Sequence, residues 1–210
     1  MPAHAVLKEA LIRSFEVPVD EETKVTYIVM EYVRGEVLKD CWDDMSEARR
    51  ERVCDQAASA IAELQSLHVD RPGPIGGGRS RGTWFTTLGA GPFHSVRELE
   101  DWFTHKLDVC KRYNRAYASI PPFMGKFGKM VMSHMDVAPR NIILEGDNNI
   151  CLIDWDFAGA YPVHFERAGL LNQVREADFC KRMLARMKPY EQEINDLESV
   201  TWAITSAYLI

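Results

Sequence analysis

Long apolar runs are missing from this sequence of 210 residues. No stretch approaches the roughly 18 consecutive apolar residues that a membrane-spanning helix needs. Residues 1–15 carry Lys8, Glu9 and Arg13, so they lack the uninterrupted apolar core of a secretory signal. We therefore expect a cytoplasmic protein with no membrane partner.

Basic residues are also in short supply. The chain has 25 lysine and arginine residues against 31 aspartate and glutamate residues, a formal net charge of −6. Binding of a nucleic-acid backbone needs a positive field, so nucleic acid is not an expected partner. Free nucleotides are still possible ligands, because a metal ion or backbone N–H groups can hold their phosphates.

Cysteine is scarce, and its spacing excludes common metal and redox sites. The five cysteines are an odd number, and no two of them have the CxxC spacing of zinc or redox sites. We expect free thiols in a reducing compartment. The GxSxG pattern of serine hydrolases and the HExxH pattern of zinc proteases are absent as well.

What is present is the composition of a compact globular protein. Hydrophobic residues make up 46% of the chain and charged residues 27%, which excludes disorder or a collagen-like repeat as a description of the whole chain. The length suits one good-sized domain, or one lobe and part of another.

The first part of the chain predicts a β-hairpin followed by a helix. Residues 11–19 and 25–33 are rich in β-branched and aromatic residues, and the polar residues between them favour a turn. Gly35 ends the extended stretch. From Ser46 onward apolar residues recur every three or four positions, which predicts an amphipathic helix capped by Ser46 or Asp44.

Helices dominate most of the remaining chain. The glycine and proline residues of 72–91 predict a polar loop. Ser95 and Glu98 have the spacing of a capping box, which predicts the start of a second helix. Further helical stretches are expected at about 166–187 and 191–207. The predicted fold class is therefore α+β.

Residues 130–161 contain the chemically informative side chains. The β-rich runs 142–145 and 150–153 flank four turn formers, which predicts an antiparallel hairpin. If paired positions sum to about 295, Asn141 lies opposite Asp154, with Cβ atoms about 4.5–5.5 Å apart. An amide oxygen and a carboxylate at that distance can share one hard cation, and such ligands suit Mg²⁺ with bound phosphates.

Asp136 precedes Asn141 by five residues and would lie in the loop that leads into this hairpin. A carboxylate there can orient a substrate hydroxyl and accept its proton, while the metal neutralises charge on the phosphate oxygens. The spacing therefore indicates phosphoryl transfer, with Asp136 as the base.

Two segments make the sequence similar to a known family. Residues 134–141 read His-Met-Asp-Val-Ala-Pro-Arg-Asn and match the kinase catalytic-loop template. Residues 153–159 read Ile-Asp-Trp-Asp-Phe-Ala-Gly and contain the metal-binding aspartate that follows it. Together with 27–35 and 91–96, these residues resemble the aminoglycoside phosphotransferase family, and within it the branch common in fungi. The resemblance spans about 11–171.

The resemblance implies a protein-kinase-like fold. Residues 1–34 would be a truncated small β lobe with its hinge, and residues 35–210 a mainly helical catalytic lobe with the catalytic β-hairpin. The implied function is ATP-dependent transfer of the γ-phosphoryl group to a hydroxyl of a small molecule, as in aminoglycoside and choline kinases.

The resemblance also assigns roles to residues. It makes Asp136 the catalytic base and Asn141 and Asp154 the magnesium ligands, whereas His134 would brace the loop. It implies that the backbone around the hinge residues contacts the adenine ring of ATP; these residues are Met30, Glu31 and Val33.

Some positions depart from the family pattern. Met135 stands where the family usually has Gly, and Asp156 stands where Glu is more usual. The glycine-rich loop, the strand lysine and the helix glutamate of a kinase small lobe are not found. Lys8 imitates the lysine strand, but only 22 residues separate it from Glu31. That is too few for two strands and a helix, so we expect no phosphate contact from Lys8.

Alternatives to an active kinase stay open at this point. The missing front of the small lobe is compatible with an inactive kinase-like relic or binding module. A metal-dependent hydrolase that uses His134, Asp136 and Asp154 is a weaker alternative. The same missing front would leave the predicted hairpin with unpaired edges, so self-association is expected.

Overall fold

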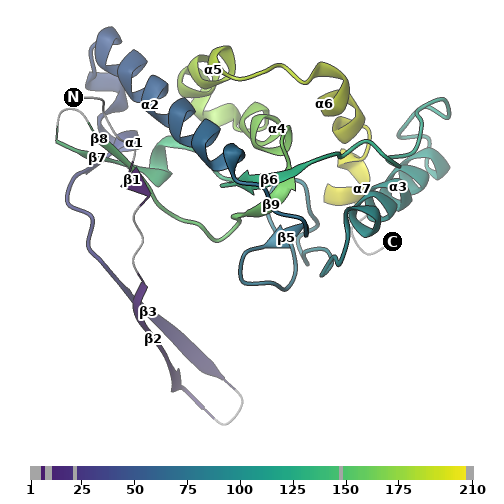
Figure 1. Cartoon of the computed structure of the whole chain (residues 1–210), viewed down its shortest axis with the longest axis horizontal. Coiled ribbons are helices and arrows are strands. Elements are labelled where there is room, and N and C mark those ends of the chain that lie inside the picture. The colour runs from purple at the N-terminus through teal and green to yellow at the C-terminus, as the bar shows by residue number, and fades with distance from the viewer. Residues whose placement is uncertain (1–5, 8–10, 21–22, 147–148, 207–210) are drawn as a thin grey trace.

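The computed structural model describes residues 6–7, 11–20, 23–146 and 149–206. Figure 1 shows a body of helices and short sheets, from which one β-hairpin extends. The predicted α+β class is therefore confirmed. Lys8 lies outside the described residues.

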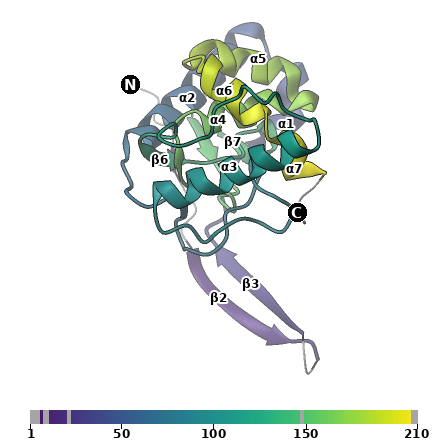
Figure 2. The same ribbon diagram turned by 90° about the vertical axis from the view of Figure 1, so that its right-hand side faces the viewer.

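The extended hairpin consists of β2 (Leu11–Pro18) and β3 (Lys24–Met30). The strands pair antiparallel, and Phe15 lies opposite Tyr27 with ring centroids 5.4 Å apart. Every residue of β3 is exposed, and Figure 2 shows the hairpin standing clear of the body. The hairpin was predicted, but its second strand is shorter than the predicted 25–33. It ends at Met30, and residues 31–34 form neither helix nor strand.

A four-stranded sheet contains the second hairpin, β7 (Ile142–Glu145) and β8 (Asn149–Leu152). On one side β4 (Glu36–Val37) pairs antiparallel with β7. On the other side β1 (Val6–Leu7) pairs parallel with β8. Residues 6–7 therefore join the sheet that contains β7 and β8.

A three-stranded sheet lies in the middle of the body. Its order is β5 (Gly73–Pro74), β9 (Gly159–Pro162) and β6 (Met130–Ser133). These strands are not predicted from the sequence. They are short, and every residue of β6 and β9 is buried, so they show no alternation of apolar and polar residues.

The helices are α1 (Leu38–Cys41), α2 (Glu47–Ser66), α3 (Val96–Arg112), α4 (Phe165–Leu171), α5 (Ala177–Arg186), α6 (Glu191–Glu198) and α7 (Thr201–Thr205). The first two predicted helices are confirmed as α2 and α3. The predicted stretch 166–187 is instead two helices, separated by the 3-10 turn Val174–Glu176. The Asn172 side chain contributes to this break, because its Nδ2 donates to the Ala168 carbonyl at 3.0 Å. The last predicted stretch is likewise divided, into α6 and α7.

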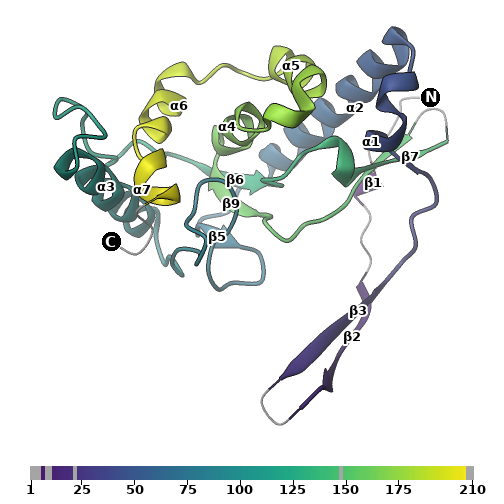
Figure 3. The same cartoon turned by 180° about the vertical axis from the view of Figure 1, so that it is seen from behind.

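Two large apolar clusters support these elements. An aromatic cluster, which includes Phe103 and Phe165, joins α3 and α4 to the three-stranded sheet. A second cluster, which includes Leu38 and Ile142, packs α1, α2 and α5 against β7 and β8. Figure 3 shows the same division, with α3, α6 and α7 at one end of the body and α1, α2 and β7 at the other. The catalytic hairpin is thus fixed by the second cluster.

In the described part of the chain, none of the helices combines the length and apolar character needed to cross a membrane. The five cysteines are free thiols, as predicted, and all but Cys41 are buried.

Candidate active site

The loop that carries Asp136 connects the two sheets. It begins after β6 at Ser133 and ends in the 3-10 turn Pro139–Asn141, directly before β7. Because β6 and β7 are both anchored in the apolar clusters, the ends of this loop are fixed. Asp136 therefore lies where the sequence predicts it, in the loop leading into the hairpin.

Asp136 and Asn141 are in direct contact. The Asn141 Nδ2 atom donates to Asp136 Oδ2 at 2.8 Å and to the Asp136 carbonyl at 2.9 Å. On the other side, Arg140 Nη2 donates to Asp136 Oδ1 at 2.5 Å. Both oxygens of the carboxylate are thus held by neighbours, which fixes its orientation.

The contact with Asp136 also orients the Asn141 amide. Asn141 is buried, and its nitrogen is used by the two bonds to Asp136. The oxygen Oδ1 is therefore the end of this side chain that is left for a ligand. An amide oxygen fits a hard cation such as Mg²⁺.

Asp154 lies at the same open end of the hairpin, but its register differs from the prediction. The paired positions of β7 and β8, such as Ile142 with Leu152, sum to 294. Beyond the ladder, the Ile153 N–H donates to the Asn141 carbonyl at 3.0 Å. Ile153 rather than Asp154 therefore lies opposite Asn141, and the predicted cross-strand pair is wrong by one residue. Asp154 follows directly, exposed and with φ of 65°.

His134 joins the catalytic loop to the segment before Asp154. Its Nδ1 accepts the Asp136 N–H at 3.3 Å, so Nε2 carries the proton and donates to the Ile153 carbonyl at 3.1 Å. Burial lowers the pKa of His134, while the negative charges of Asp136 and Asp154 act in the opposite direction. His134 therefore braces the loop, as expected, and both carboxylates lie within electrostatic reach of its ring.

Glu166 also holds this loop, although the sequence pattern does not single it out. Its carboxylate accepts the His134 N–H at 2.7 Å and the Met135 N–H at 3.1 Å. Glu166 is only 2% exposed, and this burial raises its pKa to about 7 although the two N–H bonds act against the shift. One pattern in the sequence indicates that Glu166 is buried: it shares a helix face with the apolar Leu170, four residues later.

The backbone conformation at Met135 is one that suits the Gly that the family usually has at this position. Met135 has φ of 70°, the left-handed region that favours glycine. A family that usually has Gly at this position meets no steric cost there. In this chain the buried Met135 side chain packs in the aromatic cluster, and Glu166 holds its N–H. Asp156, the other departure, is exposed and lies in the turn closed by the Ala158 N–H and the Trp155 carbonyl.

The three hinge residues lie at the end of the extended hairpin and directly after it. Met30 ends β3, Glu31 is exposed and Val33 is half-buried. Gly35 follows, and a side chain there would collide with the Leu144 carbonyl of β7. Gly35 is followed directly by β4. Because β4 pairs with β7, it joins the hinge to the catalytic hairpin.

Among the described residues, no three His, Cys, Asp or Glu side chains are grouped closely enough to hold a metal ion. A hydrolase with three such ligands would need such a group. Mg²⁺ in a phosphotransferase differs, because it keeps several waters and is held by one or two carboxylate or amide oxygens together with substrate phosphates. The pair Asn141 and Asp154 is compatible with the second kind of site.

Comparisons with known proteins point to one family. The family model described as "phosphotransferase enzyme family" (APH) matches residues 5–200. No curated protein matches the chain. Among solved structures, the gentamicin complex of APH(2'')-IIa has 12% identity and a TM-score of 0.52, and the alignment covers 95% of this chain and 64% of that one. The ADP-bound APH(2'')-Ib has 13% identity and a TM-score of 0.49, with 93% and 68% covered.

At such low identity, the likeness to the gentamicin complex shows the fold alone, and it confirms the predicted protein-kinase-like fold. The chain spans 64% of the length of that structure. The family match does not separate branches, so the narrower resemblance to the fungal branch stays a prediction.

Proposed function

Because the chain belongs to the phosphotransferase enzyme family, we propose that it transfers the γ-phosphoryl group of ATP to a hydroxyl group of a small molecule. One observation carries the proposal. Asp136 is fixed by Asn141 and Arg140 at the entrance to β7, at the same end of the hairpin as Asp154. Phosphoryl transfer needs mainly such positioned groups rather than covalent chemistry.

Asp136 is the proposed general base. Its carboxylate would accept the proton of the acceptor hydroxyl as that oxygen attacks phosphorus. The bonds from Arg140 and Asn141 hold the carboxylate in one orientation before the acceptor arrives.

Asn141 and Asp154 are the residues that would hold Mg²⁺. The bound ion would neutralise charge on the phosphate oxygens. The amide nitrogen of Asn141 is already used by Asp136, so this side chain can offer only its oxygen. His134 supports the arrangement, because it ties the Asp136 loop to the residue before Asp154.

The hinge is the proposed adenine contact. Residues 31–34 form neither helix nor strand, so the backbone groups near Met30, Glu31 and Val33 can meet the edge of a flat ring. We therefore propose a boundary after residue 34, with the small-lobe remnant and hinge before it and the catalytic lobe of 35–210 after it. ATP would lie between them.

Transfer of phosphate from Mg²⁺-ATP to a panel of aminoglycoside, choline-like and sugar acceptors tests this function. We expect turnover of at least one acceptor, and Asp136→Asn should lower kcat by about 10²- to 10⁴-fold, the usual contribution of a general base. Asp101→Asn removes an equal charge from the exposed face of α3 and should leave kcat unchanged. Absence of transfer, or equal rates for wild type and Asp136→Asn, would contradict the proposal.

An inactive relic or binding module is the second candidate. This candidate predicts nucleotide binding without transfer. Turnover that Asp136→Asn abolishes would exclude it.

A further inference from the structure

A cavity of about 230 Å³ lies at the far end of the three-stranded sheet, away from the catalytic loop. In the β6–β9 pair, Ser133 lies at the catalytic end, whereas Met130 pairs with Pro162 at the other end. Phe127 precedes that second end and His164 follows it, and both line the cavity. Four-residue strands separate the two ends by roughly 10 Å.

His164 is the buried polar group of this cavity. It is 3% exposed, and the rings of Phe127, Phe165 and Tyr190 surround it at centroid distances of 6.0, 5.3 and 6.1 Å. Among the described residues, no hydrogen bond to the ring nitrogens of His164 is found. Burial lowers the pKa of His164 to about 4, against the opposing charges of Glu193 and Asp196. The ring is therefore neutral near pH 7, and one nitrogen is an acceptor that lacks a donor.

The charged side chains that line the cavity have a net charge of −1, because they are one lysine, Lys126, and two carboxylates, Glu193 and Asp196. Lys126 Nζ donates to Asp196 Oδ2 at 2.8 Å, and Gln192 Nε2 donates to Asp196 Oδ1 at 3.1 Å. The positive charge of Lys126 balances the negative charge of Asp196. Glu193 lines the same cavity half-buried, and within the described residues no hydrogen bond or ion pair holds its carboxylate. The cavity thus combines a carboxylate, a neutral acceptor and aromatic walls.

We propose that this cavity binds a small primary ammonium compound with an apolar body, at a site separate from the phosphoryl-transfer site. The ammonium group donates to the Glu193 carboxylate and to the free nitrogen of His164. The apolar body packs on Phe123 and Phe127. The volume of 230 Å³ is below the range of about 300–1,000 Å³ typical of drug-sized ligands, so the ligand is fragment-sized.

Calorimetric titration of the full chain with benzylamine, which is protonated at neutral pH, tests this site. We expect saturable binding with a dissociation constant on the order of 1 mM, as suits a ligand of this size. Benzyl alcohol has the same shape without the charge, and it should bind at least about tenfold more weakly. Glu193→Gln keeps the shape of the side chain and should weaken benzylamine binding by about tenfold or more.

Glu198→Gln is the matched control. Glu198 lies on the same helix, is exposed and does not line this cavity, so its replacement should leave benzylamine binding within about twofold of wild type. The proposal is overturned by any of three results: no saturable binding, equal affinity for benzyl alcohol, or equal effects of Glu193→Gln and Glu198→Gln. A loss of binding in Asp136→Asn as large as in Glu193→Gln would also overturn it, since the amine would then occupy the transfer site. Thermal melting of each variant checks that it is folded.

Discussion

At the scale of single residues, one buried carboxylate sets the shape of the catalytic loop. Met135 adopts a left-handed backbone with φ of 70°, which costs a residue with a side chain about 1–2 kcal/mol. Glu166 offsets this cost, because it accepts the N–H groups of both His134 and Met135. Hydrogen bonds to an ionised acceptor are stronger than neutral ones, but burial opposes ionisation and raises the pKa of Glu166 to about 7.

This pKa gives a prediction about stability and pH. Glu166 titrates near 4.5 in the unfolded chain and near 7 when folded, so between these values the folded state binds the proton more tightly. Unfolding then releases a proton, and the contribution of Glu166 to the free energy of unfolding falls as pH rises from about 4.5 to about 7. Glu166→Gln has no proton to release and should lose this slope. Urea unfolding across this range measures it.

The exposed Glu198→Gln provides the control for this experiment and should keep the pH dependence of the wild type. If the free energy of unfolding changes with pH in the same way for wild type and Glu166→Gln, the prediction is wrong, and Glu166 titrates in the folded state much as it does in the unfolded chain.

The predicted and the missed residues of the site differ in their separation along the chain. Asp136 and Asn141 are five residues apart, and their contact follows from the spacing of the motif. Glu166 reaches His134 across 32 positions, and no local pattern states which backbone N–H groups a buried carboxylate will meet. The roles of Asn141 and Asp154 as metal ligands stay predictions.

At the scale of elements, a serine precedes each of the two long helices, but only one of the two serines caps its helix. Ser95 precedes α3, and its hydroxyl accepts the Glu98 N–H at 3.2 Å. Glu98 in turn accepts the His94 N–H at 2.7 Å, one residue before the usual partner in a capping box. Ser46 precedes α2, but its side chain makes no capping hydrogen bond.

This contrast supplies a matched pair of variants. Ser95→Ala removes a capping bond and should lower the free energy of unfolding by about 1 kcal/mol. Ser46→Ala removes no such bond and should have a clearly smaller effect. Urea unfolding of both variants at one pH makes the comparison, and equal losses would mean that the Ser95 bond contributes nothing.

Element prediction succeeded where periodicity was long and failed where it was short. The helices α2 and α3 span 20 and 17 residues, enough turns for an apolar stripe to be unambiguous. The strands β6 and β9 have four buried residues each, and a short apolar run does not distinguish strand from helix. The one-residue error in the β7–β8 register has a similar origin, because turn residues alone do not fix how many positions the turn takes.

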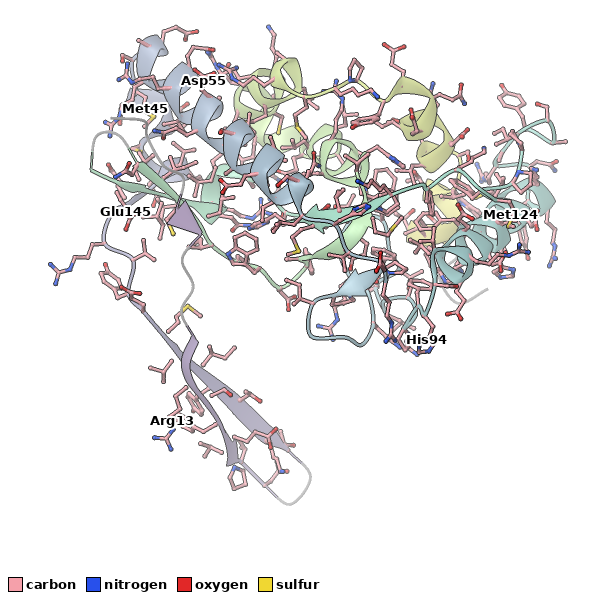
Figure 4. All side chains as sticks on the ribbon, viewed as in Figure 1. Arg13, Met45, Asp55, His94, Met124 and Glu145 are labelled. Atoms are coloured by element: carbon pink, nitrogen blue, oxygen red, sulfur yellow. The ribbon has the colours of Figure 1, made fainter. Side chains whose placement is uncertain are left out.

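At the scale of the whole molecule, the extended hairpin differs from the body because its apolar side chains are exposed rather than buried in a core. Its strands pair only with each other in the described part of the chain. Exposed apolar residues of the two strands include Phe15, Val17, Val25, Tyr27, Ile28, Val29 and Met30. Figure 4 shows Arg13 and its neighbours on this hairpin away from the body. The sequence predicted the hairpin but not its separation from the body, since that depends on distant contacts.

We expect this hairpin to make the chain self-associate. Within the described ranges both of its edges have unpaired backbone groups, and its faces carry exposed apolar side chains. The weight-average mass measured by light scattering should then rise with protein concentration. Ile28→Lys places a charge at a position that is 60% exposed on β3, where burial against a second copy would be costly, and it should keep the chain monomeric. Ile75→Lys makes the same change at an apolar residue that is 72% exposed in a loop of the body, and it should leave association as in the wild type. A monomeric wild type at every concentration, or equal association of the two variants, would mean that the hairpin is not the contact surface.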